Sequence, residues 1–161
     1  MRLTADLKTR IRDLGSESPE SIALMAKRYP DLPMAFIAQQ VKARRRIRKK
    51  LPQWFANEDI EFPDSLPLEQ CSSELAAKYR ASLLRGESLA DLTGGFGVDA
   101  FAFASGFSKV YHLERDESLS RLVARNTRAL ALEDKFDAIH ADGIQWLDSE
   151  KSRFDDLYLH P

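Results

Sequence analysis

The sequence has few of the features that mark specialised protein classes. It contains one cysteine, Cys71, so no internal disulfide can form, and a reducing compartment such as the cytoplasm is expected. No apolar run approaches the roughly 18 residues that a membrane-spanning helix needs, and we expect no membrane partner. Residues 1–12 carry charges where a secretory signal would be apolar. Seven glycines and seven prolines are too few for a chain dominated by linkers. These absences leave an ordinary globular protein.

Net charge is also nearly absent, at −1, but the two signs are unevenly distributed. Residues 1–60 carry 13 Lys and Arg against 7 Asp and Glu, whereas residues 61–161 carry 11 against 18. We therefore expect two regions with different surroundings.

Residues 1–56 predict a helical module. Apolar residues at helical spacing follow Thr4, a capping residue, and indicate a first helix. A second helix is expected to begin at Ser18 and to end before Pro30. A third is expected between Pro33 and Pro52, since proline is disfavoured inside a helix.

The third helix carries seven cations within residues 42–50. A basic face at a helix C-terminus can simply be solvated. Like charges at this spacing repel, however, which favours contact with a polyanion such as RNA. The candidate contacts are the cations on one face: Lys42, Arg45, Arg46 and Lys49. Trp54 and Phe55 follow and could stack on bases, although a core or hinge role is favoured.

Residues 57–69, with Pro63 and Pro67 among acids, predict an extended linker before a second domain at 70–161. A helix capped by Ser72 or Ser73 should open that domain. Its expected apolar face is Leu75, Ala76, Tyr79 and Leu83.

Strand and helix patterns then alternate to the end of the chain. Strands are expected at 88–92, 109–113, 136–140 and 156–159, with helices between them. This alternation predicts an α/β fold with a parallel sheet of order 3-2-1-4. The fourth strand would be an unpaired edge, which favours self-association.

Acidic residues end three successive strands around a glycine turn. Gly94, Gly95 and Gly97 would let a ligand approach the backbone at a helix N-terminus. The turn formally fits a dinucleotide fingerprint, so a nicotinamide oxidoreductase stays an alternative. S-adenosylmethionine is favoured because Asp91 could meet its cationic end, Glu114 its ribose and Asp142 its adenine amine.

Cys71 is interpreted as a buried thiol rather than a nucleophile, because no histidine lies in a recognisable partner motif. The three histidines, His112, His140 and His160, each fall at a predicted strand or strand end. None has metal-ligand spacing to another, so no metal is expected.

The segment DLTGGFGVD, residues 91–99, with Glu114 and Asp142, resembles class I S-adenosylmethionine-dependent methyltransferases. It is similar to bacterial ribosomal RNA guanine-amine methyltransferases and to trimethylguanosine-synthase-like enzymes. The resemblance is widest, over residues 34–161, to predicted bacterial methyltransferases with a helical N-terminal module and a C-terminal THUMP-like RNA-binding domain. Those proteins share a KLPxW segment, here 50–54, and an EQCSSE segment, here 69–74. The resemblance implies RNA methylation, with Thr93 among the donor-binding residues.

The chain departs from that family at the fourth strand. The related strand ends in Asp-Pro or Asn-Pro-Pro, whereas this sequence ends in His160 and Pro161, which are the candidates for the acceptor edge. The usual later strands are missing, so we expect the front part of a longer protein, truncated after strand four. No general base can be named. The remaining alternative is a non-catalytic nucleic-acid-binding or scaffold fragment that keeps the donor-binding loop.

Overall fold

The computed structural model describes residues 3–150 and 154–160. The chain divides into two compact units, Met1–Leu68 and Glu69–Pro161, and the boundary falls inside the short helix α5 (Ser65–Gln70). Within the described ranges no helix is both long and apolar enough to cross a membrane.

Helices make up the first unit. They are α1 (Ala5–Asp13), α2 (Pro19–Leu24), the 3-10 helix η1 (Met25–Lys27), α3 (Met34–Ile47) and α4 (Pro52–Ala56). The predicted caps are confirmed: the Thr4 hydroxyl accepts from the Leu7 N–H, and the Ser18 hydroxyl accepts from the Ser21 N–H. α1, α2 and α3 share one apolar core, formed by Leu7, Ile11, Ile22, Met34, Ile37, Ala38 and Val41.

The segment 57–69 is not the extended linker that its prolines suggested. Ile60 and Phe62 are fully buried, and residues 65–70 form α5. The buried Gln40 side chain explains how an irregular segment can be buried: it donates to the Phe62 carbonyl at 2.7 Å and accepts from the Phe62 N–H at 3.0 Å. Gln39 bonds the Phe62 and Pro63 carbonyls in addition. Satisfying buried backbone groups in this way lets the segment pack on α3.

The second unit holds a parallel sheet of four strands in the order β3-β2-β1-β4, as predicted. The strands are β1 (Gly86–Asp91), β2 (Phe107–Glu114), β3 (Phe136–His140) and β4 (Asp156–Tyr158). The helices are α6 (Glu74–Ser82), α7 (Val98–Phe103), α8 (Glu117–Ala129) and α9 (Gly143–Ser149). The register sets Asp91 of β1 beside His112 of β2, which brings the carboxyl ends of these strands to one edge.

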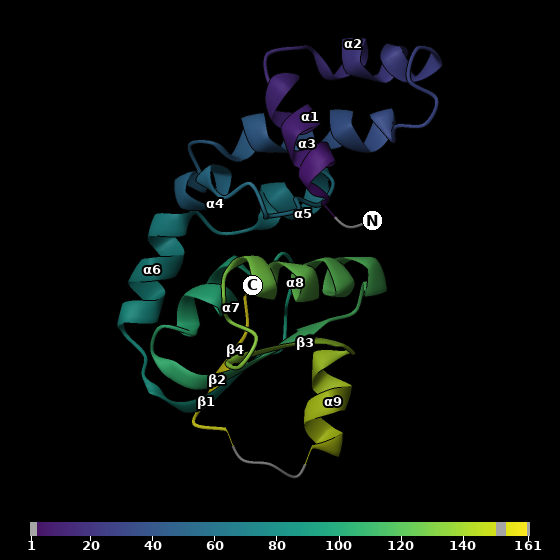
Figure 1. Ribbon diagram of the computed structural model, residues 1–161. Helices are drawn as coiled ribbons and strands as arrows, with labels where there is room; N and C mark the ends of the chain where they lie inside the picture. The colour runs from purple at the N-terminus through teal and green to yellow at the C-terminus, as the bar shows by residue number, and fades with distance from the viewer. Residues whose placement is uncertain (1–2, 151–153, 161) are drawn as a thin grey trace. The chain divides into compact units, whose positions relative to one another are not determined.

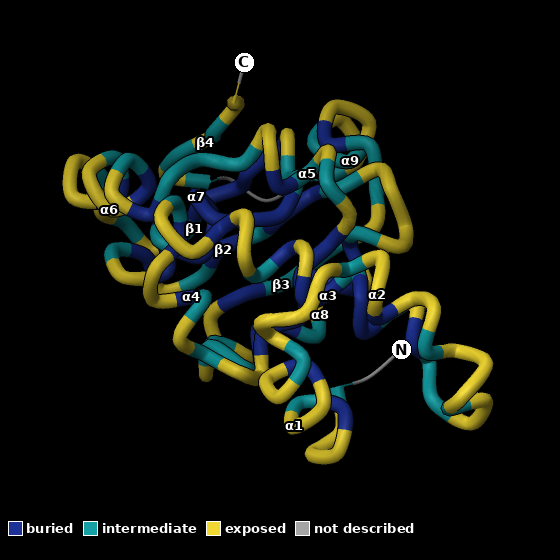
Figure 2. The backbone as a smooth tube through the Cα atoms, turned by 90° about the horizontal axis from the view of Figure 1, so that it is seen from above, coloured by how far each residue is buried: buried dark blue, intermediate teal, exposed yellow. Residues whose placement is uncertain are grey.

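Helices cover both faces of the sheet: α7 and α8 lie on one side and α9 on the other (Figure 1). On the α7 side the Phe101 and Phe136 rings stack at 4.2 Å between centroids. On the α9 side Tyr111, Trp146 and Phe154 form a second aromatic group. The tube in Figure 2 is dark blue along much of β1 and β2, as expected for strands covered on two faces.

The apolar face predicted for the helix at 74–82 is wrong. Leu75, Tyr79 and Leu83 are exposed, at 81%, 64% and 64%, whereas Ala77 and Ala81 are buried. The reason is the close packing of α6 against α7, which the small alanine side chains permit.

β4 is an outer strand, hydrogen-bonded to β1. Its apolar residues Leu157 and Leu159 are 47% and 56% exposed. The predicted self-association through this edge therefore has an apolar surface to act through, and it stays a prediction.

Candidate functional site

Asp91 ends β1 and is almost fully buried, at 2% exposure. Its Oδ1 accepts three hydrogen bonds from the turn that follows: from the Thr93 N–H at 3.0 Å, the Thr93 hydroxyl at 3.1 Å and the Gly94 N–H at 3.1 Å. Burial raises the pKa of this carboxyl, and the nearby His112 and the turn donors partly oppose the rise. All three turn bonds fall on Oδ1, so the turn occupies one oxygen of this carboxylate and not Oδ2.

The three glycines of the turn have different tasks, although all have positive φ, at 46°, 66° and 80°. A Cβ on Gly94 would lie 2.2 Å from the Leu113 carbonyl oxygen, so this glycine serves packing against β2. A Cβ on Gly97 would lie 3.3 Å from His112 Nε2. A Cβ on Gly95 would meet nothing within 4 Å. Of the three positions predicted to approach a ligand, Gly95 is the one whose backbone faces open space.

Glu114 fastens the glycine turn to β2. Its Oε2 accepts from the Gly95 N–H at 2.7 Å, and its Oε1 accepts from the Asp116 N–H at 2.7 Å. A carboxylate has about four lone-pair positions, so both oxygens can also accept a hydroxyl hydrogen. The predicted ribose ligand would share Glu114 with the backbone.

Asp142 follows β3 and caps α9. Its Oδ1 accepts from the Ile144 and Gln145 N–H groups, each at 3.1 Å, while Oδ2 lies 3.8 Å from Arg115 Nη1. Gly143 must be glycine, since a Cβ there would lie 2.2 Å from the Leu92 carbonyl oxygen. The cap positions Asp142 with one oxygen turned away from the helix N-terminus.

The chain beyond β4 contacts the same turn. The His160 N–H donates to the Thr93 hydroxyl at 2.8 Å, so the two predicted sites meet at Thr93. The Tyr158 and His160 rings lie 6.5 Å apart between centroids. Pro161, the other acceptor-edge candidate, lies outside the described residues.

His112 was not predicted as a site residue, yet it lies under the glycine turn. Its side chain is fully buried, and neither ring nitrogen has a hydrogen-bond partner in the part of the chain that the structure describes. The ring is 5.7 Å from that of Phe136, between centroids. The sequence signal was its place in β2 two residues before Glu114, which sets it beside Asp91.

A polar cluster ties α6 to the helix after the turn. Asp99 of α7 accepts from Arg80 Nε at 2.9 Å and from the Ser72 hydroxyl at 2.5 Å, and Arg80 also contacts Ser72. Burial raises the pKa of the Tyr158 phenol; the charge of Asp99 raises it further, and the charge of Arg80 lowers it.

Ser73, one of the two predicted caps, caps α6 through the Ala76 N–H. The EQCSSE segment thus supplies one serine to the cap and one to the cluster. Asp99 is the last residue of the motif at 91–99, and the sequence predicted no contact for it.

The predicted RNA-contacting residues of the first unit are exposed: Lys42, Arg45, Arg46 and Lys49. Arg45 also has a local role, because it donates to the Gly15 carbonyl at 2.9 Å and to the Glu17 carbonyl at 2.5 Å. Arg44 is partly buried and donates to backbone carbonyls, among them that of Ile60 at 2.9 Å. Part of the basic run therefore binds the protein's own backbone. Trp54 is buried, at 7%, as the core interpretation predicted.

Two other candidate chemistries are a metal site and a reactive cysteine. Among residues 3–150 and 154–160, no three His, Cys, Asp or Glu side chains come together as a metal site. Cys71, the one cysteine of the sequence, is half-buried rather than buried as predicted.

Comparison with known proteins gives one informative likeness. No model of a protein family matches the sequence, and no curated protein matches it. The crystal structure of a "putative methyltransferase" from Porphyromonas gingivalis W83 matches 99% of this chain with a TM-score of 0.83 at 28% identity. This chain spans 41% of that protein. The likeness agrees with a methyltransferase-like Rossmann fold for the sheet unit.

Proposed function

We propose that the protein is an S-adenosylmethionine-dependent methyltransferase that acts on RNA. The observation that carries the proposal is the set of carboxylates Asp91, Glu114 and Asp142 at the ends of the three adjacent strands β1, β2 and β3. They surround a glycine turn whose Gly95 has open space beside it. The "putative methyltransferase" from P. gingivalis supports the activity by its fold and by 28% sequence identity.

Each carboxylate has a role that suits its geometry. Asp91 Oδ2 is free of turn contacts, and a buried carboxylate gains most from a cationic partner, so it would hold the ammonium end of the donor. Glu114 would accept the ribose hydroxyls while it holds the Gly95 N–H. Asp142 would accept from the adenine amine through Oδ2. The bound donor supplies the methyl group on its sulfonium.

The protein's contribution to transfer would be alignment, which supplies most of the acceleration in such displacements. The acceptor would lie at the end of β4, where the backbone of His160 is bonded to Thr93. RNA is the proposed acceptor, and the exposed cations Lys42, Arg45, Arg46 and Lys49 would contact its phosphates.

Titration calorimetry tests donor binding. We expect S-adenosylmethionine or its demethylated product to bind more tightly than NAD. Glu114→Ala should weaken binding by about 1–3 kcal/mol, the range for hydrogen bonds to a charged group. Glu117→Ala is the matched control, because Glu117 is an exposed acid that pairs with Arg121 on α8. Equal donor binding by wild type and Glu114→Ala would contradict the assignment.

Methyl transfer to mixed cellular RNA separates the enzyme from a binding fragment that keeps the donor loop. We expect little transfer by these 161 residues even when the donor binds, because they span 41% of the P. gingivalis protein whose fold they share. Robust turnover would contradict this account of the acceptor side. A chain that prefers NAD would instead support the oxidoreductase alternative.

A further inference from the structure

A cavity lies in the first unit, at the end of α3 that carries the cations. It has a volume of about 360 Å³, within the range of roughly 300–1,000 Å³ typical of small-molecule sites. Its walls come from α1, α3 and the residues that end α4. The lining includes five cations, one aromatic ring and one carboxylate: Lys8, Arg12, Arg44, Arg45, Arg48, Phe55 and Glu58.

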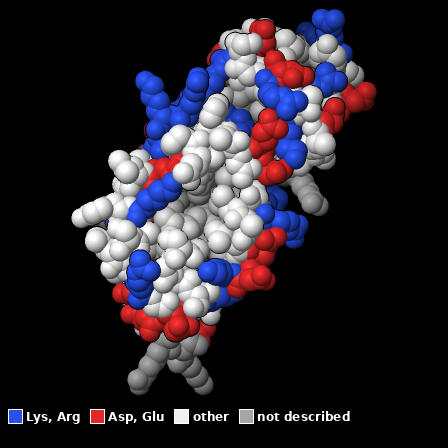
Figure 3. Space-filling model, turned by 60° about the vertical axis from the view of Figure 1, so that its left-hand side comes forward, with Lys and Arg blue, Asp and Glu red and all other residues white. Residues whose placement is uncertain are grey.

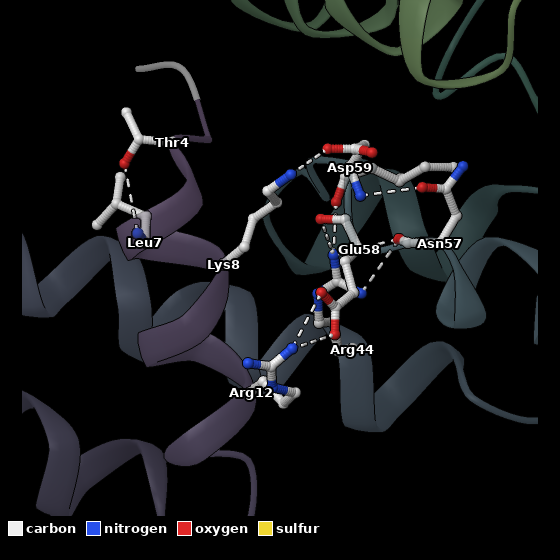
Figure 4. Close-up of polar contacts among 9 residues, drawn as sticks. Thr4, Leu7, Lys8, Arg12, Arg44, Asn57, Glu58 and Asp59 are labelled. Atoms are coloured by element: carbon white, nitrogen blue, oxygen red, sulfur yellow. Dashed lines mark hydrogen bonds and ion pairs between the residues drawn. The ribbon is translucent and has the colours of Figure 1, made fainter.

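The positive charge of this cavity is only partly neutralised. Lys8 pairs with Asp59 at 2.6 Å and Arg12 with Glu58 at 3.3 Å (Figure 4). Arg44 is held differently: its guanidinium donates to the carbonyls of Phe55, Asn57, Glu58 and Ile60. Carbonyl dipoles satisfy donors without cancelling the charge, so Arg44 and its neighbours leave a positive field in the cavity.

The burial of Arg44 strengthens that field. Its Nε is buried and has no hydrogen-bond partner among the described residues. Desolvation lowers the pKa of this guanidinium, although Glu58 and Asp59 oppose the shift. A cation with little access to water gains more from an anionic ligand than an exposed one does.

Phe55 and Arg48 give the cationic cavity a flat wall. Arg48 Cζ lies 5.7 Å from the centroid of the Phe55 ring, and both residues line the cavity. Aromatic rings and guanidinium planes are the surfaces on which unpaired bases stack. A cationic pocket with such a wall suits a ligand that has both a phosphate and a base.

The cavity is distinct from the exposed helix face. On the face that Figure 3 draws, blue cationic side chains occur in several groups, some of them beside red carboxylates. Lys42, Arg46 and Lys49 are not among the residues that line this cavity. Arg45 belongs both to the proposed RNA-contacting set and to the cavity lining, so the cavity adjoins that helix face.

From the cavity, its uncompensated arginines and its Phe55–Arg48 wall, we infer that the first unit binds a nucleoside phosphate, either free or as an unpaired residue of an RNA strand. The phosphate would contact Arg48 and the neighbouring cations, and the base would lie on Phe55. The inference does not depend on the donor site proposed for the second unit.

The test measures binding of uridine 5′-monophosphate, inorganic phosphate and hexauridylate to the full 161-residue chain by titration calorimetry at low salt. Uridine is chosen because the proposed donor site would recognise adenine. Arg48→Gln should weaken uridine monophosphate binding about tenfold, since a charge-assisted contact is lost. Arg28→Gln, the same change at an exposed arginine that lies 5.6 Å from the Tyr29 ring and does not line this cavity, should weaken it less than about twofold. Phe55→Leu should weaken it at least about fivefold and leave phosphate binding unchanged.

Similar affinities for the monophosphate and hexauridylate would assign a free nucleotide, and much tighter binding of hexauridylate would assign an RNA strand; both support the inference. It is overturned if phosphate binds as tightly as the monophosphate, if Arg48→Gln and Arg28→Gln behave alike, or if nothing binds. Melting temperatures of the variants verify their folding. Saturating the chain with S-adenosylmethionine should leave uridine monophosphate binding unchanged, and failure of the donor assignment would be visible separately in the donor titration.

Discussion

The two units use opposite charges for the same physical task. In Glu69–Pro161, carboxylates hold irregular backbone by accepting N–H groups: Asp91 and Glu114 hold the glycine turn, and Asp155 holds the start of β1. In Met1–Leu68, cations hold irregular backbone by donating to carbonyls, as Arg44 and Arg45 do.

The direction of the connections explains this difference. Turns of the sheet unit run into helix N-termini, where N–H groups are unsatisfied, as at Asp142 before α9. Connections of the helical unit leave helix C-termini, where carbonyls are unsatisfied, as at Gly15 after α1 and at Asn57 after α4. The basic first third and acidic remainder of the sequence therefore reflect local architecture as well as any partner.

The strongest test concerns the glycine turn itself. Gly94→Ala combines positive φ with a Cβ 2.2 Å from the Leu113 carbonyl oxygen, and it should reduce the free energy of unfolding by at least about 3 kcal/mol. Gly95→Ala has the φ penalty without the clash and should cost about 1 kcal/mol. Urea titrations of both variants measure the difference. Equal losses would mean that the turn is not fixed by packing against β2.

The matching test in the helical unit removes the arginine that holds four carbonyls. Arg44→Met keeps much of the side-chain volume but leaves those carbonyls without their donor, and it should cost about 2–3 kcal/mol. Lys42→Met, at an exposed position of the same helix, should change stability by less than about 0.5 kcal/mol. If both variants are equally stable to urea, the cations of α3 do not stabilise the first unit.

Arg80 is a cation of the sheet unit that pairs with a carboxylate instead of donating to backbone carbonyls. Its partner Asp99 is 8% exposed, so Arg80→Gln should cost about 2 kcal/mol. Arg128→Gln breaks an exposed pair with Glu133 and should cost less than about 0.5 kcal/mol. Thermal unfolding of the two variants gives the difference; similar melting temperatures would remove any stabilising role from the cluster at Asp99.

The smallest expected effect is a pH dependence at Asp91. Its pKa is raised above the ordinary value of 3.8, so the folded protein binds a proton more tightly than the unfolded chain does. The contribution of Asp91 to stability should therefore fall as pH rises from 3.8 through the raised pKa, and then stay constant. Asp91→Asn, which keeps an acceptor for Thr93 and Gly94, should lack this fall. Urea titrations of both proteins across that range provide the measurement, and parallel pH profiles would contradict the burial argument.

Periodicity and capping signals predicted most of the fold. Strand and helix alternation gave the parallel sheet and its order, because connection lengths and the β-α-β rule leave few topologies. The segment 57–69 could not be predicted, since its burial depends on Gln39 and Gln40 of a distant helix. The face of α6 was missed for a similar reason: the buried side is chosen by the small Ala77 and Ala81, not by the larger apolar residues.

The sequence predicted that acidic residues end three neighbouring strands, but it did not predict what surrounds these residues. Asp91, Glu114 and Asp142 stand at strand ends in the sequence, so their common edge follows from the sheet. The backbone contacts that engage them, and the burial of His112 beneath Gly97, follow from the conformation of the turn. The pocket at Phe55 joins residues from three elements, and no local pattern encodes it.

The Thr93 hydroxyl donates to the Asp91 carboxylate and accepts from the His160 N–H, so one side chain is shared by both halves of the proposed reaction centre. By thermodynamic linkage, whatever effect a ligand at Asp91 has on the affinity for a ligand at His160 is matched by the same factor in the reverse direction. Thr93→Val would keep the shape but remove both bonds, and with them this route of coupling between the two halves.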